Sequence, residues 1–245
     1  MRALIRSAIW PPLLRLTDGI VRRWYFDART RERFGRQEFF ANAFKALRFN
    51  DISGDYAEFG AGWGVTFGLA YKESRRLLSD VHMWAFDSFQ GLPGHGDERD
   101  EHPQWIPGKM ATPRDGFDAA VAKQGIPRAA YTVVEGYYDD TLAVAPDTQP
   151  TDIALAYVDC DLYSSTKTVL EFLAPRLKHG MIVAFDDYFC WSPTQVAGER
   201  RAQQEFAAAN DRWEWLPWMQ YGWSGMSFVI EDRRLGGATV EAPPT

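Results

Sequence analysis

Apolar and amphipathic segments alternate along most of this chain. Seven short apolar segments have the length and composition of β-strands, and they cover residues 55–60, 81–87, 130–136, 153–159, 180–187, 212–219 and 225–232. Segments with apolar positions at helical spacing lie before and between them, at residues 29–49, 64–78, 114–125, 165–177 and 194–210. The pattern predicts helices and strands in alternation, preceded by a helical region over residues 1–50.

This alternation predicts an α/β fold with a mostly parallel sheet and helices on both faces. Strands that are buried on both faces form continuous apolar runs, as residues 153–158 (IALAYV) do. The last two strands follow each other without an intervening helix, so we expect them to add an antiparallel edge. No internal repeat or domain boundary is evident. We therefore expect one domain at residues 51–235, with an N-terminal helical extension at residues 1–50 and a disordered tail at residues 236–245.

The composition is that of an ordinary soluble globular protein, with 46% hydrophobic and 24% charged residues. A net charge of -6 gives no basic footprint for nucleic acid. No apolar run reaches the roughly 18 residues of a membrane span. The basic start, residues 1–16, contains prolines and no clean cleavage site, so we interpret it as an amphipathic segment. We expect a cytoplasmic protein with reduced Cys160 and Cys190, whose N-terminal helices are a candidate dimer interface.

The segment EFGAGWG, residues 58–64, places three glycines between a strand and a helix. Gly60, Gly62 and Gly64 would allow positive φ and a close approach of ligand to backbone, and Glu58 can accept hydrogen bonds from a ribose or an amino group. The spacing is one residue tighter than in dinucleotide-binding loops, which disfavours NAD. A tight structural turn is the alternative. Asp87 ends the next strand, where an acid would hold two ribose hydroxyls, so loop and acid together indicate an adenosine ligand.

Two further strands end in pairs of carboxylates, Asp159 with Asp161 and Asp186 with Asp187. Ligands bind beyond the carboxyl ends of strands in such sheets, so we expect both pairs to face the same crevice as the glycine loop. Clustered carboxylates are costly unless a cation lies among them. An oxygen-only set suits Mg²⁺, Mn²⁺ or Ca²⁺ better than zinc. The alternative is that the acids cap the following helices, for which Asp161 is well placed.

Residues 91–110 are rich in glycine, proline and charge, and we expect them to be too polar to pack and too long for a simple turn. A loop of this length inside a compact domain is more often functional than idle. It would be either a lid that closes over bound ligands or an inert surface loop.

Five motifs occur in a fixed order: EFGAGWG, FDSFQGLP, EGYYDDTL, VDCDLYSSTKTVLEFLAPRLKHGMIVAFDDY and RRAQQEF. In this order the chain resembles the macrocin O-methyltransferase family over roughly residues 55–210. The resemblance implies a class I methyltransferase fold, which is Rossmann-like with a seven-stranded sheet. It also implies S-adenosylmethionine as methyl donor and Mg²⁺-dependent methylation of a hydroxyl, often on a sugar of a natural product.

The resemblance implies roles for individual residues as well. Asp159, Asp186 and Asp187 would hold the metal, and Asp161 would be the general base. The cofactor contacts would be Glu58, Gly60, Gly62, Gly64, Asp87 and Ser88. A bound cation would lower the pKa of the acceptor hydroxyl and orient it, and the base would take the proton.

The sequence departs from the family pattern in two places. Phe59 and Trp63 replace a cysteine and an arginine of the usual glycine loop, and the aromatic-rich segment 213–234 has no counterpart, which leaves the sugar or glycoside acceptor unidentified. Two alternatives stay open. A glycosyltransferase could use the D-x-D motif for Mn²⁺ and a nucleotide sugar, and a non-catalytic cofactor-binding protein could have the same fold.

Overall fold

The computed structural model describes residues 27–77, 81–94, 96–143 and 148–235. The tail expected to be disordered, residues 236–245, and the first 26 residues of the expected helical extension lie outside this described part. The strands are β1 (Asp55–Phe59), β2 (Met83–Asp87), β3 (Tyr131–Glu135), β4 (Ile153–Val158), β5 (Ile182–Phe185), β6 (Trp213–Tyr221) and β7 (Gly225–Asp232). The α-helices are α2 (Ala28–Phe49), α3 (Val65–Leu77), α4 (Arg114–Lys123), α5 (Tyr138–Thr141), α6 (Tyr163–Leu173) and α7 (Gly198–Ala209).

The strands form one seven-stranded sheet in the order β3-β2-β1-β4-β5-β7-β6. Strands β1 to β5 pair in parallel, whereas β7 is antiparallel to both β5 and β6. The predicted fold class is therefore confirmed, including the antiparallel pair. The chain builds outward from β1 to β3, returns, and builds the other way from β4, so the strand order reverses between β1 and β4. Ligands in open α/β sheets bind at such a reversal, beyond the carboxyl ends of the strands.

Backbone hydrogen bonds continue past the strand ends at this reversal. The Gly60 amide donates to Phe86 at 2.8 Å, and the Asp159 amide donates to Phe59 at 2.8 Å. One strand further, the Asp186 amide donates to Val158 at 2.9 Å. These bonds fix the register, so that the glycine loop and both acidic pairs follow the strands at the same edge of the sheet.

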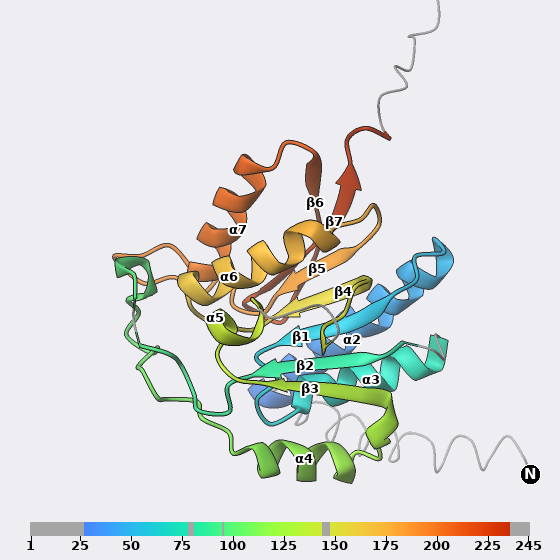
Figure 1. Ribbon diagram of the computed structural model, residues 1–245, viewed down its shortest axis with the longest axis horizontal. Helices are drawn as coiled ribbons and strands as arrows, with labels where there is room; N and C mark the ends of the chain where they lie inside the picture. The colour runs from blue at the N-terminus through green and yellow to red at the C-terminus, as the bar shows by residue number, and fades with distance from the viewer. Residues whose placement is uncertain (1–26, 78–80, 95, 144–147, 236–245) are drawn as a thin grey trace, which may run out of the picture.

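Helices cover both faces of the sheet (Figure 1). Buried side chains of α2, α3 and α4 share one hydrophobic cluster with the sheet, and those of α6 and α7 share a second cluster on the opposite face. Strand β4 is buried at every residue and supplies both clusters, with Leu155 and Tyr157 in the first and Ala156 and Val158 in the second. Among the helices that the structure describes, none is long and apolar enough to cross a membrane.

Helix α2 is part of the core of the sheet. Its buried residues are Phe39, Phe40, Ala43, Phe44 and Leu47. The Phe39 ring stacks on Tyr221 of β6 at 4.4 Å between centroids, and the Phe40 ring lies 5.3 Å from Tyr157 of β4. This packing fixes α2 across β4 and β6, and it brings the first half of the helix to the acidic edge.

Two helix boundaries differ from the sequence prediction by four residues. The helix expected at 165–177 ends at Leu173 and continues as a 3-10 turn, Ala174–Arg176, because Pro175 cannot donate a backbone hydrogen bond. The helix expected at 194–210 begins only at Gly198. Before it, the Ser192 hydroxyl accepts from the amides of Thr194 and Gln195, and such local bonds compete with helix formation.

The long loop at residues 91–110 packs against the domain, so the expectation that it is too polar to pack was wrong. Leu92, Asp100 and Trp105 are buried, and Glu98–Asp100 form a 3-10 turn. Leu92 and Trp105 share a small hydrophobic cluster with Leu162, which directly precedes α6. An apolar anchor within a polar stretch is enough to fix such a loop.

Candidate active site

A cavity of about 530 Å³ opens at the carboxyl edge of the sheet, where the strand order reverses. Its lining comes from the loops that follow β1, β2, β3 and β4, together with part of the 91–110 loop. Of the candidate metal, cofactor and catalytic residues named from the sequence, six line it: Gly60, Gly62, Asp87, Ser88, Asp159 and Asp161. The glycine loop, the acid that ends β2 and the first acidic pair therefore line the same cavity.

Gly60 and Gly62 shape the floor of the cavity next to β1. Gly60 has φ 97°, and a Cβ atom there would lie 1.8 Å from the carbonyl oxygen of Asp159. No other residue fits this position without moving the end of β4. Gly62 has φ 45°, and its amide donates to Asp87 Oδ2 at 2.7 Å.

Asp87 fixes the glycine loop through its own carboxylate. Besides the bond from Gly62, its Oδ1 accepts from the Phe89 amide at 2.6 Å. Burial raises the pKa of Asp87 above its usual value, although both backbone bonds act to lower it. Ser88 beside it is held in a turn, with its hydroxyl donating to Gly91 at 3.1 Å. Each carboxylate oxygen keeps acceptor capacity for a ligand hydroxyl.

Glu58 and Gly64, which the resemblance assigned to cofactor binding, are not part of the cavity lining. Glu58 is fully buried; its Oε2 accepts from the Tyr56 hydroxyl at 2.5 Å, and burial raises its pKa to about 8. Gly64 has φ 65°, and a Cβ there would approach Phe117 and Val121 of α4 to 3.1–3.2 Å. The glycine at position 64 is thus explained by helix packing.

The second acidic pair, Asp186 and Asp187, follows β5 and lies next to the first pair without lining the cavity. Burial, followed by the charges of Asp186 and Asp187, raises the pKa of Asp159 well above its usual value. The pKa of Asp187 is also raised, by burial and then by Asp186. The two pairs therefore form one electrostatic cluster.

Glu199 of α7 is a fifth member of this cluster that sequence reasoning missed. It is fully buried, and it accepts from the Cys160 amide at 3.1 Å and from the Asp187 amide at 2.8 Å. It thereby joins the ends of β4 and β5. Burial, and then the charge of Asp187, raises its pKa well above the usual value. Nothing local in the sequence marks it, because an acid in the first turn of a helix is ordinary.

Arg36 of α2 supplies the positive charge nearest to the cluster and was also missed. Its Nε donates to Asp186 Oδ1 at 2.9 Å, and its Nη2 donates to Oδ2 at 2.5 Å. Tyr157 donates to the same carboxylate. Burial acts to lower the pKa of Arg36, but its bonds to Asp186 outweigh this and raise it. In the sequence Arg36 is one of several arginines on this helix, so its role could not be singled out.

Asp161 occupies a strained turn at the edge of the cavity. Its φ is 62°, and the Leu162 amide donates to Cys160 at 2.6 Å across it, which makes Asp161 the centre of a γ-turn. The carboxyl groups of Asp161 and Asp187 lie close enough to interact electrostatically. Burial, followed by the charge of Asp187, raises the pKa of Asp161 well above its usual value.

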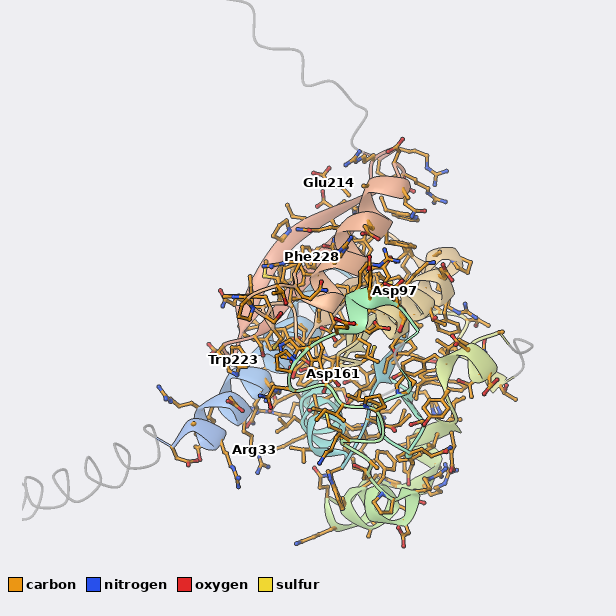
Figure 2. The ribbon with its side chains drawn as sticks, turned by 90° about the vertical axis from the view of Figure 1, so that its left-hand side faces the viewer. Arg33, Asp97, Asp161, Glu214, Trp223 and Phe228 are labelled. Carbon is orange, nitrogen blue, oxygen red and sulfur yellow. The ribbon has the colours of Figure 1, made fainter. Side chains whose placement is uncertain are left out.

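The helix-cap alternative is wrong for both pairs. Helix α6 begins after Leu162 without a side-chain cap from its own segment, and its first turn is capped by Asp100, whose Oδ1 accepts from the Ser164 amide at 2.9 Å. Helix α7 begins after Ala197, far along the chain from Asp186 and Asp187. Figure 2 looks onto this side of the molecule, with Asp161 near its centre.

The donor chemistry of the cluster suits a hard cation, because every titratable side chain in it is a carboxylate. Burial, and then the charges of neighbouring carboxylates, raise the pKa values of Asp159, Asp187 and Glu199 together. Within the described ranges, however, no three His, Cys, Asp or Glu side chains stand in an arrangement that could hold a metal ion. Asp186 is bound to Arg36 instead.

Known proteins that are similar to this chain are O-methyltransferases. The family described as macrocin-O-methyltransferase (TylF) matches residues 31–216. Demethyldecarbamoylnovobiocin O-methyltransferase from Streptomyces niveus is 31% identical over 202 residues, which is 76% of this chain and 72% of that protein. The 8-demethyl-8-(2,3-dimethoxy-alpha-L-rhamnosyl)-tetracenomycin-C 4'-O-methyltransferase from Streptomyces olivaceus is 31% identical over 144 residues. That match covers 56% of this chain and 54% of the relative, so it spans about half of the relative's length.

The fold agrees as well. The structure of the O-methyltransferase NovP has a TM-score of 0.67 at 24% identity and covers 80% of this chain and 79% of its own. At this identity the likeness supports the fold alone, whereas the family match covers most of the chain. The chain belongs to the macrocin O-methyltransferase family and is an S-adenosylmethionine-dependent O-methyltransferase.

Proposed function

We propose that this enzyme methylates a hydroxyl of a sugar or a glycosylated natural product. One observation carries the proposal: a single cavity is lined by Gly60, Gly62 and Asp87 on one side and by Asp159 and Asp161 on the other. A methyl donor bound at the glycine loop would thus face an acidic acceptor site. The names of the two relatives, which act on a rhamnosylated tetracenomycin and on a novobiocin precursor, support a glycoside as acceptor.

Gly60, Gly62, Asp87 and Ser88 form the cofactor side of the proposed site. The open backbone at Gly62, where a Cβ would meet only Thr112 Oγ1 at 3.9 Å, leaves room for a ligand against the loop. The Asp87 carboxylate keeps free lone pairs for the two ribose hydroxyls. Glu58 and Gly64 act behind the cavity wall in this proposal, as a buried polar contact and a packing position.

Asp161 is the proposed general base. As the acceptor oxygen attacks the sulfonium methyl, the C–O bond forms, the C–S bond breaks, and S-adenosylhomocysteine leaves as a neutral thioether. The hydroxyl proton passes to the Asp161 carboxylate. The position of Asp161 supports this role, because its carboxylate lines the same cavity as the glycine loop and Asp159.

We further propose that Mg²⁺ is held by Asp159, Asp186 and Asp187. When bound, the ion supplies charge that lowers the pKa of the acceptor hydroxyl. The oxygen-only donors and the shared elevation of the pKa values of Asp159 and Asp187 support it. Since Arg36 binds both oxygens of Asp186, the ion would have to compete with Arg36 for this carboxylate.

Methyl transfer from labelled donor tests the proposal. Purified enzyme would be incubated with methyl-labelled S-adenosylmethionine and demethyldecarbamoylnovobiocin, a rhamnosylated tetracenomycin, or the matching sugar-free aglycones, and the products analysed by mass spectrometry. We expect label on a sugar of at least one glycoside and none on its aglycone. Label on the aglycone alone would show that the acceptor class is wrong. Repeating the assay after exhaustive chelation tests the ion separately, since undiminished turnover would exclude a metal requirement.

Family membership removes the glycosyltransferase alternative and the non-catalytic alternative. A glycosyltransferase that binds a nucleotide sugar at the D-x-D motif would also not explain why Asp87 accepts a hydrogen bond from Gly62 of the glycine loop. Residues of the 91–110 loop line a further part of the cavity.

A further inference from the structure

Beyond the ends of β4 and β5, the backbone of the two acidic pairs is held by two kinds of acceptor. The amides of Asp159 and Asp186 continue the sheet and donate to the neighbouring strands at 2.8 and 2.9 Å. The next amide on each segment donates to the side chain of Glu199 instead. Its Oε1 accepts from Cys160 at 3.1 Å, and its Oε2 accepts from Asp187 at 2.8 Å. Glu199 therefore provides the acceptors where the strand pairing ends.

Both of these bonds lie inside the acidic segments, residues 159–161 and 186–187. Cys160 separates Asp159 from Asp161, and Asp187 is the second acid after β5. Because β4 and β5 are neighbouring strands, one side chain reaches both segments. Each oxygen of the carboxyl group accepts from one segment, and the covalent geometry of the group sets the distance between the two oxygens. The Glu199 side chain thus fixes the two acidic segments relative to each other.

Helix α7 lies beside α6 (Figure 1), and its start packs on the turn at Asp161. At Gly198 a Cβ atom would lie 2.7 Å from the amide nitrogen of Tyr163 and 3.0 Å from the carbonyl oxygen of Asp161. A side chain does not fit at these distances, so the glycine allows the two backbones to meet. The next residue, Glu199, is fully buried. Its carboxyl group is therefore held against the turn by the packing of the helix that carries it.

The turn at Asp161 depends on contacts of this kind. Asp161 has φ 62°, a conformation that is disfavoured for a residue with a side chain and persists only where the surroundings determine it. The γ-turn supplies one bond, from the Leu162 amide to Cys160. Glu199 supplies another, to the Cys160 amide. Glu199 does not line the cavity, whereas all three residues of 159–161 do, so it acts on the site through them.

We propose that Glu199 is a positioning residue for methyl transfer. Its carboxyl group would hold the two acidic segments in register and thereby keep the Asp161 carboxylate at the cavity in its working orientation. This inference rests on the proposed role of Asp161 as the base. It assigns a function to a buried acid that lies outside the cavity and that touches neither the cofactor nor the acceptor in the proposed site.

The variant Glu199→Gln removes one acceptor while keeping the size of the side chain. An amide has a single oxygen, so its NH₂ group has to face one of the two backbone amides, which then loses its acceptor. Glu73→Gln is the matched control. Glu73 of α3 is also buried, with an exposed fraction of 2%, and it accepts from Gln37 Nε2 at 2.8 Å without lining the cavity. Melting temperatures would show that both variants fold.

The first readout needs no acceptor substrate. In assigned ¹H–¹⁵N spectra, the amide proton of Cys160 or of Asp187 should shift upfield in Glu199→Gln, and neither should shift in Glu73→Gln. Labelling with ¹⁵N-cysteine isolates the Cys160 signal, because the chain contains two cysteines and the signal lost in Cys190→Ser is the other one. If both amide signals stay in place in Glu199→Gln, the proposal is overturned.

The second readout is methyl transfer to whichever acceptor takes up label from the labelled donor, glycoside or aglycone. We expect kcat of Glu199→Gln to fall about 10- to 100-fold, as for a misplaced reacting group. The calorimetric affinity for S-adenosylhomocysteine should change less than about twofold, because the proposed cofactor side, at the glycine loop and Asp87, is built on β1 and β2. A merely structural role would weaken cofactor binding together with turnover.

The double variant shows whether Glu199 acts through the base. Adding Glu199→Gln to Asp161→Asn should cause little further loss of kcat, because both changes act on one group. Losses that multiply would contradict the positioning role.

The two proposals fail in different ways. Label on the aglycone alone would overturn the acceptor class, and the role of Glu199 would then be decided with the aglycone. Wild-type turnover of Asp161→Asn would overturn the base assignment and the positioning role with it. An impaired Asp161→Asn together with wild-type kcat in Glu199→Gln would overturn the positioning role alone. Equal losses of kcat in Glu199→Gln and Glu73→Gln would also overturn it.

Discussion

Replacing Arg36 with Met would test the electrostatic balance of the acidic cluster. The change keeps most of the aliphatic stem and removes the two bonds to Asp186, of 2.9 and 2.5 Å. The Asp186 side chain is only 6% exposed and that of Arg36 is 25% exposed. Breaking a buried ion pair from one side costs about 3–5 kcal/mol, and the partial exposure of Arg36 places the expected loss near the lower end, at about 3 kcal/mol.

The same change should strengthen Mg²⁺ binding. At the proposed metal site of the wild-type protein, the ion would have to displace Arg36 from Asp186, whereas in Arg36→Met the carboxylate would be free. If half of the lost stability is recovered on binding, Mg²⁺ affinity rises about tenfold, since 1.4 kcal/mol is a factor of ten. Urea unfolding without Mg²⁺ and at Mg²⁺ concentrations that increase in tenfold steps would measure the loss of stability and its recovery. Calorimetric titration with Mg²⁺ would measure the change in affinity.

Arg33→Met is the matched control, since Arg33 lies on the same helix and is exposed (Figure 2). It should change the free energy of unfolding by less than about 0.5 kcal/mol. A large loss in Arg36→Met that Mg²⁺ does not restore would refute Asp186 as a metal ligand. Unchanged stability of Arg36→Met would refute the ion pair itself.

Four further predictions concern the cavity and its walls. Asp87→Ala removes the acceptor of the Gly62 amide and of the proposed ribose hydrogen bonds. Because a hydrogen bond to a charged group contributes about 1.5–3 kcal/mol, calorimetry should show at least about tenfold weaker binding of S-adenosylhomocysteine. Wild-type affinity would contradict the proposal that Asp87 binds the cofactor. Gly60→Ala should fail to fold stably, as circular dichroism would show, because its Cβ would meet a backbone oxygen at 1.8 Å. Burial raises the pKa of Glu58 to about 8 from 4.5, so between these pH values the folded protein keeps a proton that the unfolded chain has lost, and the free energy of unfolding falls as pH rises. Urea unfolding at pH 5 and 8.5 should show that Glu58→Gln removes this loss of stability. Proteolysis within residues 91–110 should be slower with cofactor and Mg²⁺ than without; equal rates would favour a static wall.

Local patterns were sufficient to predict the scaffold. The apolar run of β4 predicted a strand buried on both faces, and all six of its residues are buried. The lack of a helix between residues 219 and 225 predicted the antiparallel pair β6–β7. Because the ends of the strands could be recognised in the sequence, the glycines that follow β1 and the carboxylates at the ends of β2 and β4 could be identified as candidate site residues. The parallel register of the strands then brings these residues around one cavity.

What the sequence alone could not decide is which side chains complete the site. Arg36 reaches Asp186 across 150 residues of sequence, Glu199 reaches Cys160 across 39, and Asp100 reaches Ser164 across 64. Spacing along the chain reports on the local backbone, and it carries no information on which of several arginines or glutamates the packed helices bring to one edge. The same limit explains Glu58 and Gly64, whose places in the glycine loop were predicted but whose environments depend on Tyr56 and on the packing of α4. The sequence by itself determined the strands and the chemistry at their ends. The tertiary structure decided which charge balances the acids and which loop contacts the start of α6, because both depend on contacts between elements that only the complete packing brings together.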